Sequence, residues 1–277
     1  MIENIVVVSD LHIGCKLGLC KDEFTLDEGG KYSSSKYQKE VYSKWIEFWD
    51  DWVPKVTKGK PYIMVINGDV VDGVHHNSTT QITQNMQDQR RLAVEILEPI
   101  VNKKKCKALY MIRGTEAHVG KSGSHEEAIA SELGAVPNEG IHAPWEMWLR
   151  FGRNDQLVHF THHVGTTGSA AYESTAVYKE LVEAYNEAGR WGNEPPSIVV
   201  RSHRHRAFEI RVPTKFGYGI AICTPGWQLK TPFVYRMPMG RSGTPMIGGM
   251  VIRDGDQDGL YTREKIWQIQ RTPEVRI

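Results

Sequence analysis

The feature that most constrains this chain is a series of short apolar runs, each ending at a cluster of acidic or imidazole side chains. The first run, residues 5–8, is Ile-Val-Val-Val and stops at Ser9-Asp10. Runs of this length and β-branched content are typical of buried strands. Five clusters follow such runs: Asp10-Leu11-His12, Gly68-Asp69, Gly114-Thr115-Glu116-Ala117-His118, His162-His163 and His203-Arg204-His205. We therefore expect the chemistry on loops at the ends of strands.

The same runs predict the secondary structure. Strands are expected at residues 5–8, 62–66, 108–112, 146–151, 156–161, 198–201, 207–212, 218–223, 246–253 and 259–268, and helices at residues 37–52, 83–101, 124–133 and 169–188. The first half alternates strand and helix, which is typical of the βαβ units of an α/β fold. In the helix of residues 37–52, Trp45, Phe48 and Trp49 recur at three- and four-residue spacing, which predicts a core-facing stripe. That helix is expected to stop before Pro54.

The length of the chain, 277 residues, suits one large α/β domain or two small ones. No internal repeat, low-complexity tract or linker is recognisable. We therefore expect a single domain over residues 1–277. Two irregular stretches, residues 14–35 and 121–145, are expected to be insertions at the rim of the pocket.

Charge and cysteine content limit the classes of partner and compartment. The chain has 34 Lys+Arg against 33 Asp+Glu, so no overall field favours a nucleic acid or a membrane surface. Its four cysteines form no C-x-x-C pair, which indicates thiols in a reducing compartment. The first apolar run is too short for a signal peptide or a membrane span. We expect a cytoplasmic protein with no membrane partner.

The donor types in the clusters indicate a transition-metal site. The chain contains 11 histidines, and imidazole is the commonest ligand of such metals. Imidazole and carboxylate together suit Mn, Fe, Zn or Ni, whereas Ca and Mg sites rely mostly on oxygen. In an α/β sheet, the loops that follow the strands lie near one another. The sequence therefore predicts that the clusters meet at one metal site.

Taken together, the clusters resemble the motifs of the calcineurin-like metallophosphoesterase superfamily. Its motifs are D-x-H, G-D, G-N-H-[DE], a lone His and G-H-x-H, and this chain follows their order from Asp10 to His205. The third motif departs from the pattern, and Ser202 replaces the usual Gly of the last one. The resemblance implies a four-layer α/β/β/α sandwich with the metal site at the strand ends.

The resemblance also implies two divalent metal ions, with Mn favoured and Fe, Zn or Ni as alternatives. Asp10, His12 and His205 would bind one ion, and Asp69 would bridge both. His203 and one of the adjacent pair His162 and His163 would hold the second ion. We favour His162, because it is the first imidazole after its strand, and keep His163 as the alternative. Such an ion pair, about 3.5–4 Å apart, clamps a phosphate and lowers the pKa of a bridging water.

The altered third motif leaves two ligand or catalytic positions to be filled. Thr115 stands where the superfamily has a ligating Asn, and Glu116 where it has the His that helps to protonate the leaving group. Because Thr is a poor ligand, Glu116 is a candidate ligand of the second metal. His118, two residues downstream, is the candidate general acid. For both residues a purely structural role is an equal alternative.

Each of these residues also has an ordinary structural explanation. Asp10 could cap the turn after a strand, and Asp69 follows Asn67-Gly68, which is good turn chemistry. His203 and His205, at i and i+2, could lie on one face of a solvated strand. The ordered set favours the metal site. Arg204 is the candidate substrate-binding residue, with a solvated strand face as the alternative.

The predicted function is metal-dependent hydrolysis of a phosphate ester. A phosphodiesterase is favoured by the breadth of the superfamily and the altered motif, and its substrate could be a nucleotide or a nucleic acid. A phosphomonoesterase, including a protein phosphatase, is the alternative. A third hypothesis, from another class, is a binding or scaffold protein that keeps the fold, since the superfamily includes such members. The retained Asp10, His12, Asp69, His203 and His205 argue against it.

Overall fold

The first apolar run forms the middle strand of a five-stranded sheet. In the computed structural model, residues 2–75, 77–165, 169–215, 217–237, 243–255 and 259–269 are described. The sheet has the order β12-β11-β1-β4-β5. Its strands are β1 (Asn4–Val8), β4 (Tyr62–Asn67), β5 (Cys106–Ile112), β11 (Ile247–Asp254) and β12 (Leu260–Trp267). β1, β4 and β5 run parallel, and β11 pairs antiparallel with both β1 and β12.

A second five-stranded sheet contains the strands between residues 146 and 223, in the order β6-β7-β8-β10-β9. These are β6 (Glu146–Phe151), β7 (Gln156–Thr161), β8 (Ile198–Arg201), β9 (Phe208–Thr214) and β10 (Gly217–Cys223). β7, β8 and β10 are parallel, while β6 and β9 are antiparallel edge strands. Both sheets therefore contain a parallel centre whose carboxyl ends can carry a site.

The alternation of side chains along β1 explains how the sheets are buried. Ile5 and Val7 pack in the core between the two sheets, with residues such as Phe160 and Ile222 from the second sheet. Val6 and Val8 belong to the core on the opposite face of the first sheet. Because successive side chains of a strand point to opposite faces, one continuous apolar run can serve both cores.

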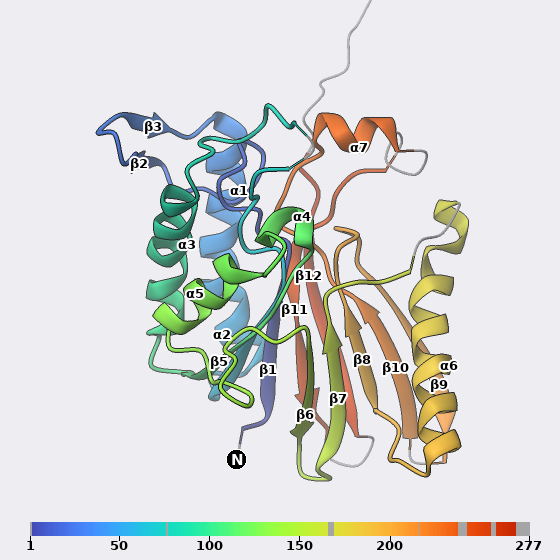
Figure 1. The fold of residues 1–277 in the computed structure, drawn as a ribbon. Helices are drawn as coiled ribbons and strands as arrows, with labels where there is room; N and C mark the ends of the chain where they lie inside the picture. Colours follow the sequence, from blue (N-terminus) through green and yellow to red (C-terminus); the bar gives the residue numbers. More distant parts are fainter. Residues whose placement is uncertain are drawn as a thin grey trace, which may run out of the picture.

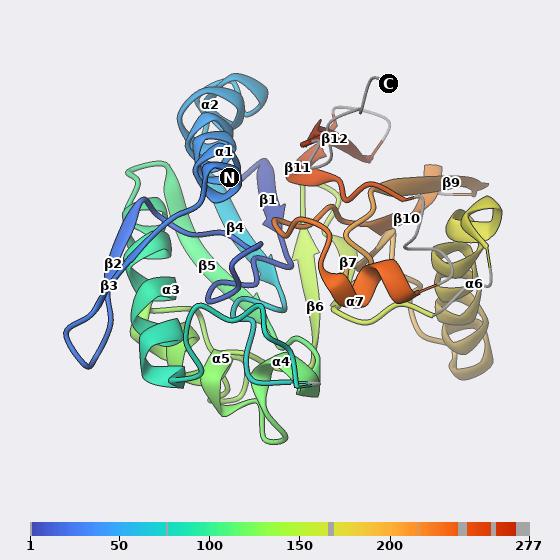
Figure 2. The same cartoon turned by 90° about the horizontal axis from the view of Figure 1, so that it is seen from above.

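Helices cover the outer faces of both sheets (Figures 1 and 2). On the first sheet lie α1 (Lys36–Glu47), α2 (Val53–Val56), α3 (Met86–Val101) and α5 (Ser124–Glu132). α6 (Glu173–Trp191) packs on the second sheet through Val177 and Leu181. The four-layer α/β/β/α sandwich is therefore confirmed. No helix within the described residues is both long and apolar enough to cross a bilayer.

The predicted strands and long helices are present, with small shifts at their ends. α3 begins at Met86, not at residue 83, because the side chain of Asn85 caps it. The prediction that the helix of residues 37–52 stops before Pro54 is wrong. A π-helical turn, η1 (Phe48–Trp52), follows α1, and the amide of Val53 donates to the carbonyl of Phe48. This wider turn places Pro54 in the first turn of α2, where its missing N–H costs nothing.

Some short elements were not predicted from the sequence. They are the hairpin of β2 (Glu23–Thr25) and β3 (Lys31–Ser33), α4 (Glu116–Val119) and α7 (Pro232–Arg236), while the helix predicted at residues 169–188 begins as a 3-10 turn, η2 (Ala170–Tyr172). Each is five residues or shorter, so it carries too few residues for a periodic pattern. α4 and α7 lie near the strand ends at the top of Figure 1.

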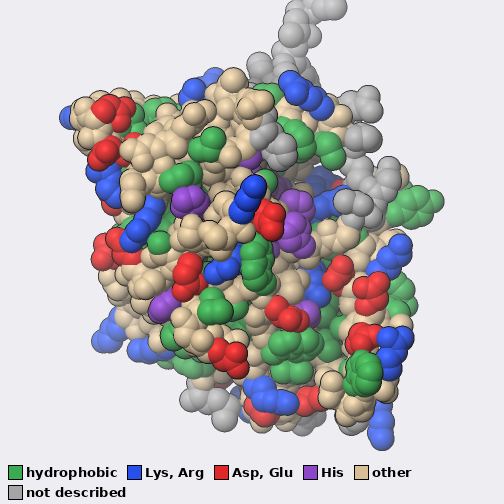
Figure 3. All heavy atoms as spheres, viewed as in Figure 1, with side chains coloured by type: hydrophobic (Ala, Val, Ile, Leu, Met, Phe, Trp, Pro, Cys, Tyr) green, Lys and Arg blue, Asp and Glu red, His purple; other side chains and the backbone are tan. Residues whose placement is uncertain are grey.

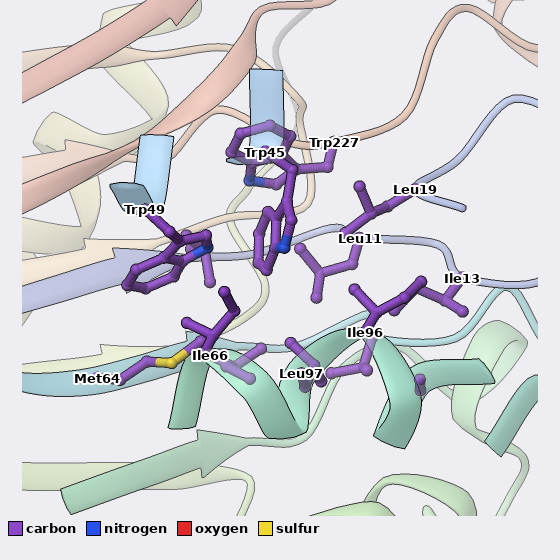
Figure 4. Close-up of a cluster of buried hydrophobic side chains, with 14 of the residues drawn as sticks. Leu11, Ile13, Leu19, Trp45, Trp49, Met64, Ile66, Ile96, Leu97 and Trp227 are labelled. Carbon is purple, nitrogen blue, oxygen red and sulfur yellow. The ribbon is translucent and has the colours of Figure 1, made fainter. Parts of the chain in front are cut away.

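The aromatic stripe of residues 45–52 is a core stripe, as predicted. Trp45 and Phe48 are fully buried, and Trp49 is 1% exposed. The ring of Trp45 makes edge contacts with Trp49 and Trp227, at centroid distances of 5.5 and 4.9 Å (Figure 4). This packing joins α1 to the segment after β10, beside the loop that carries the site.

Replacing Trp45 by Ala should lower the free energy of unfolding by about 3–5 kcal/mol, because it leaves a large cavity in the core. Urea denaturation followed by far-UV circular dichroism measures this. Trp191→Ala is the matched control: Trp191 is 70% exposed and should change stability by no more than about 0.5 kcal/mol. Equal effects of the two substitutions would contradict the assigned packing.

Candidate metal centre

The loops after four parallel strands meet at one end of the two sheets (Figure 1). The amide of Asp10 donates to the carbonyl of Gly68 over 3.0 Å, which ties the loop after β1 to the loop after β4. The amide of His203 donates to Oδ2 of Asp10 over 3.2 Å, which ties in the loop after β8. The amide of Ser202 donates to the carbonyl of His162 over 2.9 Å. Loops from both sheets therefore form one cluster.

The backbone at this cluster is held in an uncommon conformation. Asp10, His12, Asp69, His203 and His205 have φ of 53°, 45°, 53°, 71° and 49°. They are five of the nine non-glycine residues with positive φ in the described part of the chain. Residues with a Cβ adopt this region rarely and at a cost, and such residues gather at functional sites. The backbone therefore marks the same residues that the motifs single out.

Asp10, His12 and His205 converge as one group of donors. Nε2 of His12 lies 3.1 Å from Nε2 of His205, and the latter lies 3.3 Å from Oδ1 of Asp10. Two imidazole nitrogens on one tetrahedral cation would be roughly 3.3 Å apart for metal–nitrogen bonds of about 2.0–2.1 Å. The spacing fits two ligands of a shared ion.

Asp69, His162 and His203 form a second group. Oδ2 of Asp69 is 3.0 Å from Nε2 of His162 and 4.0 Å from Nδ1 of His203. His162 is 1% exposed, whereas the neighbouring His163 is exposed and belongs to none of the donor groups found among the described residues. Of the two adjacent histidines, His162 is therefore the one that the structure brings to the cluster.

Oxygen atoms outside the cluster orient the imidazoles. Nδ1 of His162 lies 2.6 Å from the carbonyl oxygen of Asn67, to which it can only donate. Nδ1 of His12 faces Oδ1 of Asp72 at 3.3 Å. Each contact leaves Nε2 directed at the cluster, which is how oxygen partners orient metal-binding histidines. Asp72 is itself buried and accepts from Gln81 and Gln228, over 3.0 and 3.2 Å. Asp72 also forms a donor group with His75 and His118, and its contact with Nδ1 of His12 positions that ring.

The charges in the cluster are strongly coupled. Burial raises the pKa of Asp10, but the imidazoles of His205 and His162 outweigh it and bring the pKa to about 2. Burial likewise opposes ionisation of Asp69, yet His162 and His118 hold its pKa well below the ordinary value. For His162, burial lowers the pKa, but Asp69 and Asp10 raise it to about 10. A protonated imidazole thus supplies the positive charge that the two carboxylates require.

The same cluster fits divalent cations. Oδ1 of Asp10 and Nε2 of His162 are buried and make no hydrogen bond with the described residues, although each has a charged group within 3.3 Å. Buried polar atoms without hydrogen bonds are costly, and divalent cations in the cluster would satisfy both. The donors are imidazole nitrogens and carboxylate oxygens, the set that Mn, Fe, Zn and Ni share.

The third motif is arranged differently from its prediction. Thr115 donates to Oδ1 of Asp69 from its amide, over 2.7 Å, and from its hydroxyl, over 3.1 Å. Glu116, the predicted ligand, is exposed and lies in none of the donor groups of the described residues. The reason is local: α4 begins at Glu116, so the chain turns away at this residue. Its ligand role has no support in the geometry.

The turn of α4 returns His118 to the cluster. Its ring lies 4.5 Å from that of His12, and its Nε2 is 3.9 Å from Oδ2 of Asp69. Its Nδ1 is 2.6 Å from the carbonyl oxygen of Asp72, so Nδ1 carries a proton. Burial lowers the pKa of His118 to about 4. In the neutral ring Nε2 holds a lone pair, and a proton-donor role requires the less favoured charged form.

A buried carboxylate that the motifs do not include connects two of the site loops. Glu126, in the first turn of α5, is fully buried. Its Oε1 accepts from the amide of Val70 over 2.7 Å, and its Oε2 from the amide of Gly114 over 2.6 Å. Burial raises its pKa to about 7. Sequence analysis missed this residue, because an acidic residue in a first helical turn is ordinary.

A pocket of about 700 Å³ opens over the cluster, and histidine side chains are visible at the surface near the middle of the face in Figure 3. His12, Asp69, His203 and His205 line it, together with the substrate-binding candidate Arg204. Residues 77–80, 228–234, 236 and 237 form much of its wall. The segments 14–35 and 121–145, predicted at the rim, contribute no lining residue. The first packs on α3 instead, where the amide of Asp27 donates to Asp88.

No protein-family model and no curated protein matches the chain. Several solved structures are similar to it. Vps29 from Chaetomium thermophilum is 9% identical with a TM-score of 0.44, covering 96% of this chain and 98% of that one. A metallophosphoesterase from Sphaerobacter thermophilus is 11% identical with a TM-score of 0.40, covering 95% and 88%. A predicted phosphoesterase from Streptococcus pneumoniae is 11% identical with a TM-score of 0.35, covering 96% and 98%.

The layer order and the position of the motifs at the strand ends agree with the sequence resemblance. The four-layer sandwich is the fold that the resemblance implies. The motif residues Asp10, His12, Asp69, His203 and His205 lie together at one end of its sheets. The likeness to the calcineurin-like metallophosphoesterase superfamily is therefore confirmed at the level of the fold.

His162→Ala should reduce bound Mn²⁺ by about one equivalent, because the variant loses a donor that no neighbour replaces. Elemental analysis of protein loaded with Mn²⁺ and then desalted measures the stoichiometry. His163→Ala is the matched control on the adjacent residue and should retain the wild-type content. Loss of metal in His163→Ala with retention in His162→Ala would reverse the assignment of the two histidines.

Proposed function

We propose that this protein is a two-metal phosphoesterase that favours phosphodiesters. The observation that carries the proposal is the convergence of two donor groups on buried, unsatisfied atoms. Asp10, His12 and His205 would hold one cation, and His162 and His203 the other. Asp69, which belongs to both sides of the cluster, would lie between them.

The chemistry of such a centre explains the residues around it. Two divalent cations held there would polarise a phosphoryl oxygen and lower the pKa of a nearby water. Mn²⁺ is our preferred ion because the donors mix nitrogen and oxygen, and Fe, Zn and Ni also accept this set. The chain's own part is to hold the donors rigidly, through Asn67 behind His162 and Asp72 behind His12.

Among the three arginines near the last motif, Arg204 is the best candidate to bind a phosphate oxygen. Arg201 is 3% exposed and donates to Glu180 over 3.0 Å, so it is part of the packed interior. Arg206 donates to Glu173 over 3.0 Å. Arg204 lines the pocket beside His203 and His205, and its Nη1 donates to the carbonyl of Gly165 over 3.3 Å. A guanidinium there suits the planar recognition of phosphate.

The size of the pocket supports a substrate with a sizeable organic group. Its 700 Å³ lies within the range of small-molecule sites and extends well beyond the cluster to α7. A phosphodiester, such as a nucleotide or a nucleic-acid strand end, has a second ester group that can use this space. A phosphomonoesterase is the alternative, because the same centre can act on either ester.

Purified protein should hydrolyse bis-p-nitrophenyl phosphate faster than p-nitrophenyl phosphate when Mn²⁺ is added, and EDTA should abolish both reactions. Asp69→Asn should lower kcat for the diester by more than about 100-fold, since the variant loses the carboxylate that would hold both ions. Glu116→Ala is the matched control in the third motif and should keep most of the activity.

The other outcomes distinguish the alternative functions. Preference for the monoester would show a phosphomonoesterase. Two equivalents of bound metal without turnover of either ester would favour a binding or scaffold protein. Full activity in Asp69→Asn would contradict the two-metal mechanism itself.

A further inference from the structure

One wall of the pocket is largely apolar and is supplied by one short segment. α7 contributes Pro232, Phe233 and Val234, and Met237 follows it. The helix has no buried residue, and Phe233 and Met237 are 51% and 46% exposed. Large apolar side chains exposed at the wall of a pocket are typical of a binding surface. The wall and the metal centre line the same pocket, so one molecule can contact both.

The charges along this wall favour an uncharged or anionic ligand. Lys230 and Arg236 line the pocket on either side of the apolar residues, and basic and hydrophobic side chains lie together at the surface over α7 (Figure 3). Among the described lining residues, the acidic ones are Asp69, Asp72 and Glu173. The two aspartates are engaged in the cluster, and Glu173 is paired with Arg206. The described part of the wall therefore offers no acidic partner for a cationic group.

We propose that α7 binds the second ester group of a phosphodiester and that this group is apolar. The proposal rests on the proposed function, because the phosphate must sit at the metal centre for its ester group to reach the wall. Contact with Phe233 and Met237 removes apolar surface of the ester group from water, so binding strengthens with the size of that group. α7 is thus the segment that determines specificity.

The test is a series of p-nitrophenyl phosphodiesters with methyl, butyl, phenyl or choline as the second group. With Mn²⁺, kcat/KM should be about tenfold higher for the butyl than for the methyl ester, or roughly twofold per methylene. The choline ester should be the poorest substrate. Phe233→Ala should lower the butyl-to-methyl ratio several-fold, whereas Phe233→Leu should largely preserve it, because Leu keeps an apolar surface. Trp191→Ala, on the outer helix α6, should leave the ratio unchanged.

The outcomes separate this proposal from the proposed function. Equal kcat/KM for the methyl and butyl esters would overturn the apolar subsite while leaving the phosphoesterase intact. A preference for the choline ester would overturn the charge argument. Hydrolysis of none of the esters would refute the proposed function first.

A separate observation concerns Glu126, whose contacts position the loop that carries Asp69. Its carboxylate joins the loop that carries Asp69 to the loop that carries Thr115, through the amides of Val70 and Gly114. Thr115 in turn fixes Oδ1 of Asp69. We infer that Glu126 sets the position of Asp69, although it does not itself belong to a donor group of the described residues.

Replacement of Glu126 by Gln tests this, because an amide has one acceptor for two backbone N–H groups. Glu127→Gln is the matched control: Glu127 is the next residue of α5 and caps two amides of another loop, those of His142 and Ala143, over 2.9 and 2.8 Å. Both variants should lose stability. Only Glu126→Gln should also weaken Mn²⁺ binding, by about 10–100-fold in calorimetric titration. Equal affinity in both variants, or rescue of neither property by Glu126→Asp, would overturn the positioning role.

Discussion

The structure around the candidate centre depends on the burial of one carboxylate, that of Asp69. The residue is 1% exposed, and a charge in such a place is tolerated only with partners on both of its oxygens. Thr115 holds Oδ1 through two hydrogen bonds, while Oδ2 faces His162 at 3.0 Å. Asp69 follows β4, and these partners follow two other strands, β5 of the same sheet and β7 of the second sheet. Because the two sheets pack face to face, side chains from both of them can contact the buried carboxylate of Asp69.

This arrangement destabilises the folded state. Five residues of the cluster have positive φ, and two buried carboxylates, Asp10 and Asp69, share a small volume. In the chain alone, the high pKa of His162 shows how the cost is reduced: a proton on the imidazole provides the missing positive charge. Divalent cations would displace that proton and satisfy Oδ1 of Asp10 and Nε2 of His162, which make no hydrogen bond with the described residues. Large aromatic cores nearby, around Trp45 and Trp227, supply the compensating stability.

Much of this could be predicted from the sequence, because the relevant signals are local. Apolar runs predict the strands of both sheets. The polar clusters that follow these runs contain the site residues Asp10, Asp69 and His203. What could not be predicted depends on tertiary contacts. Whether His162 or His163 enters the site is decided by the carbonyl of Asn67, which is 95 residues away in the chain. The exposed position of Glu116 follows from a single turn of helix, and the role of Glu126 from contacts with Val70 and Gly114 that no spacing encodes.

The third motif shows how a site can keep its geometry after its motif has changed. Thr115, at the position of the expected amide ligand, instead restrains Asp69 with its amide and hydroxyl. His118 returns to the cluster by one turn of α4 and is held by the backbone oxygen of Asp72. That oxygen takes the proton-bearing Nδ1, so the nitrogen facing Asp69 has a lone pair in the neutral ring. As placed, His118 is therefore suited to accept a proton or to bind a cation, and it becomes a proton donor only after it has been charged. The backbone carbonyl of Asp72 fixes the proton on Nδ1 of His118. This contact therefore decides whether Nε2 accepts a proton, binds a cation or donates a proton.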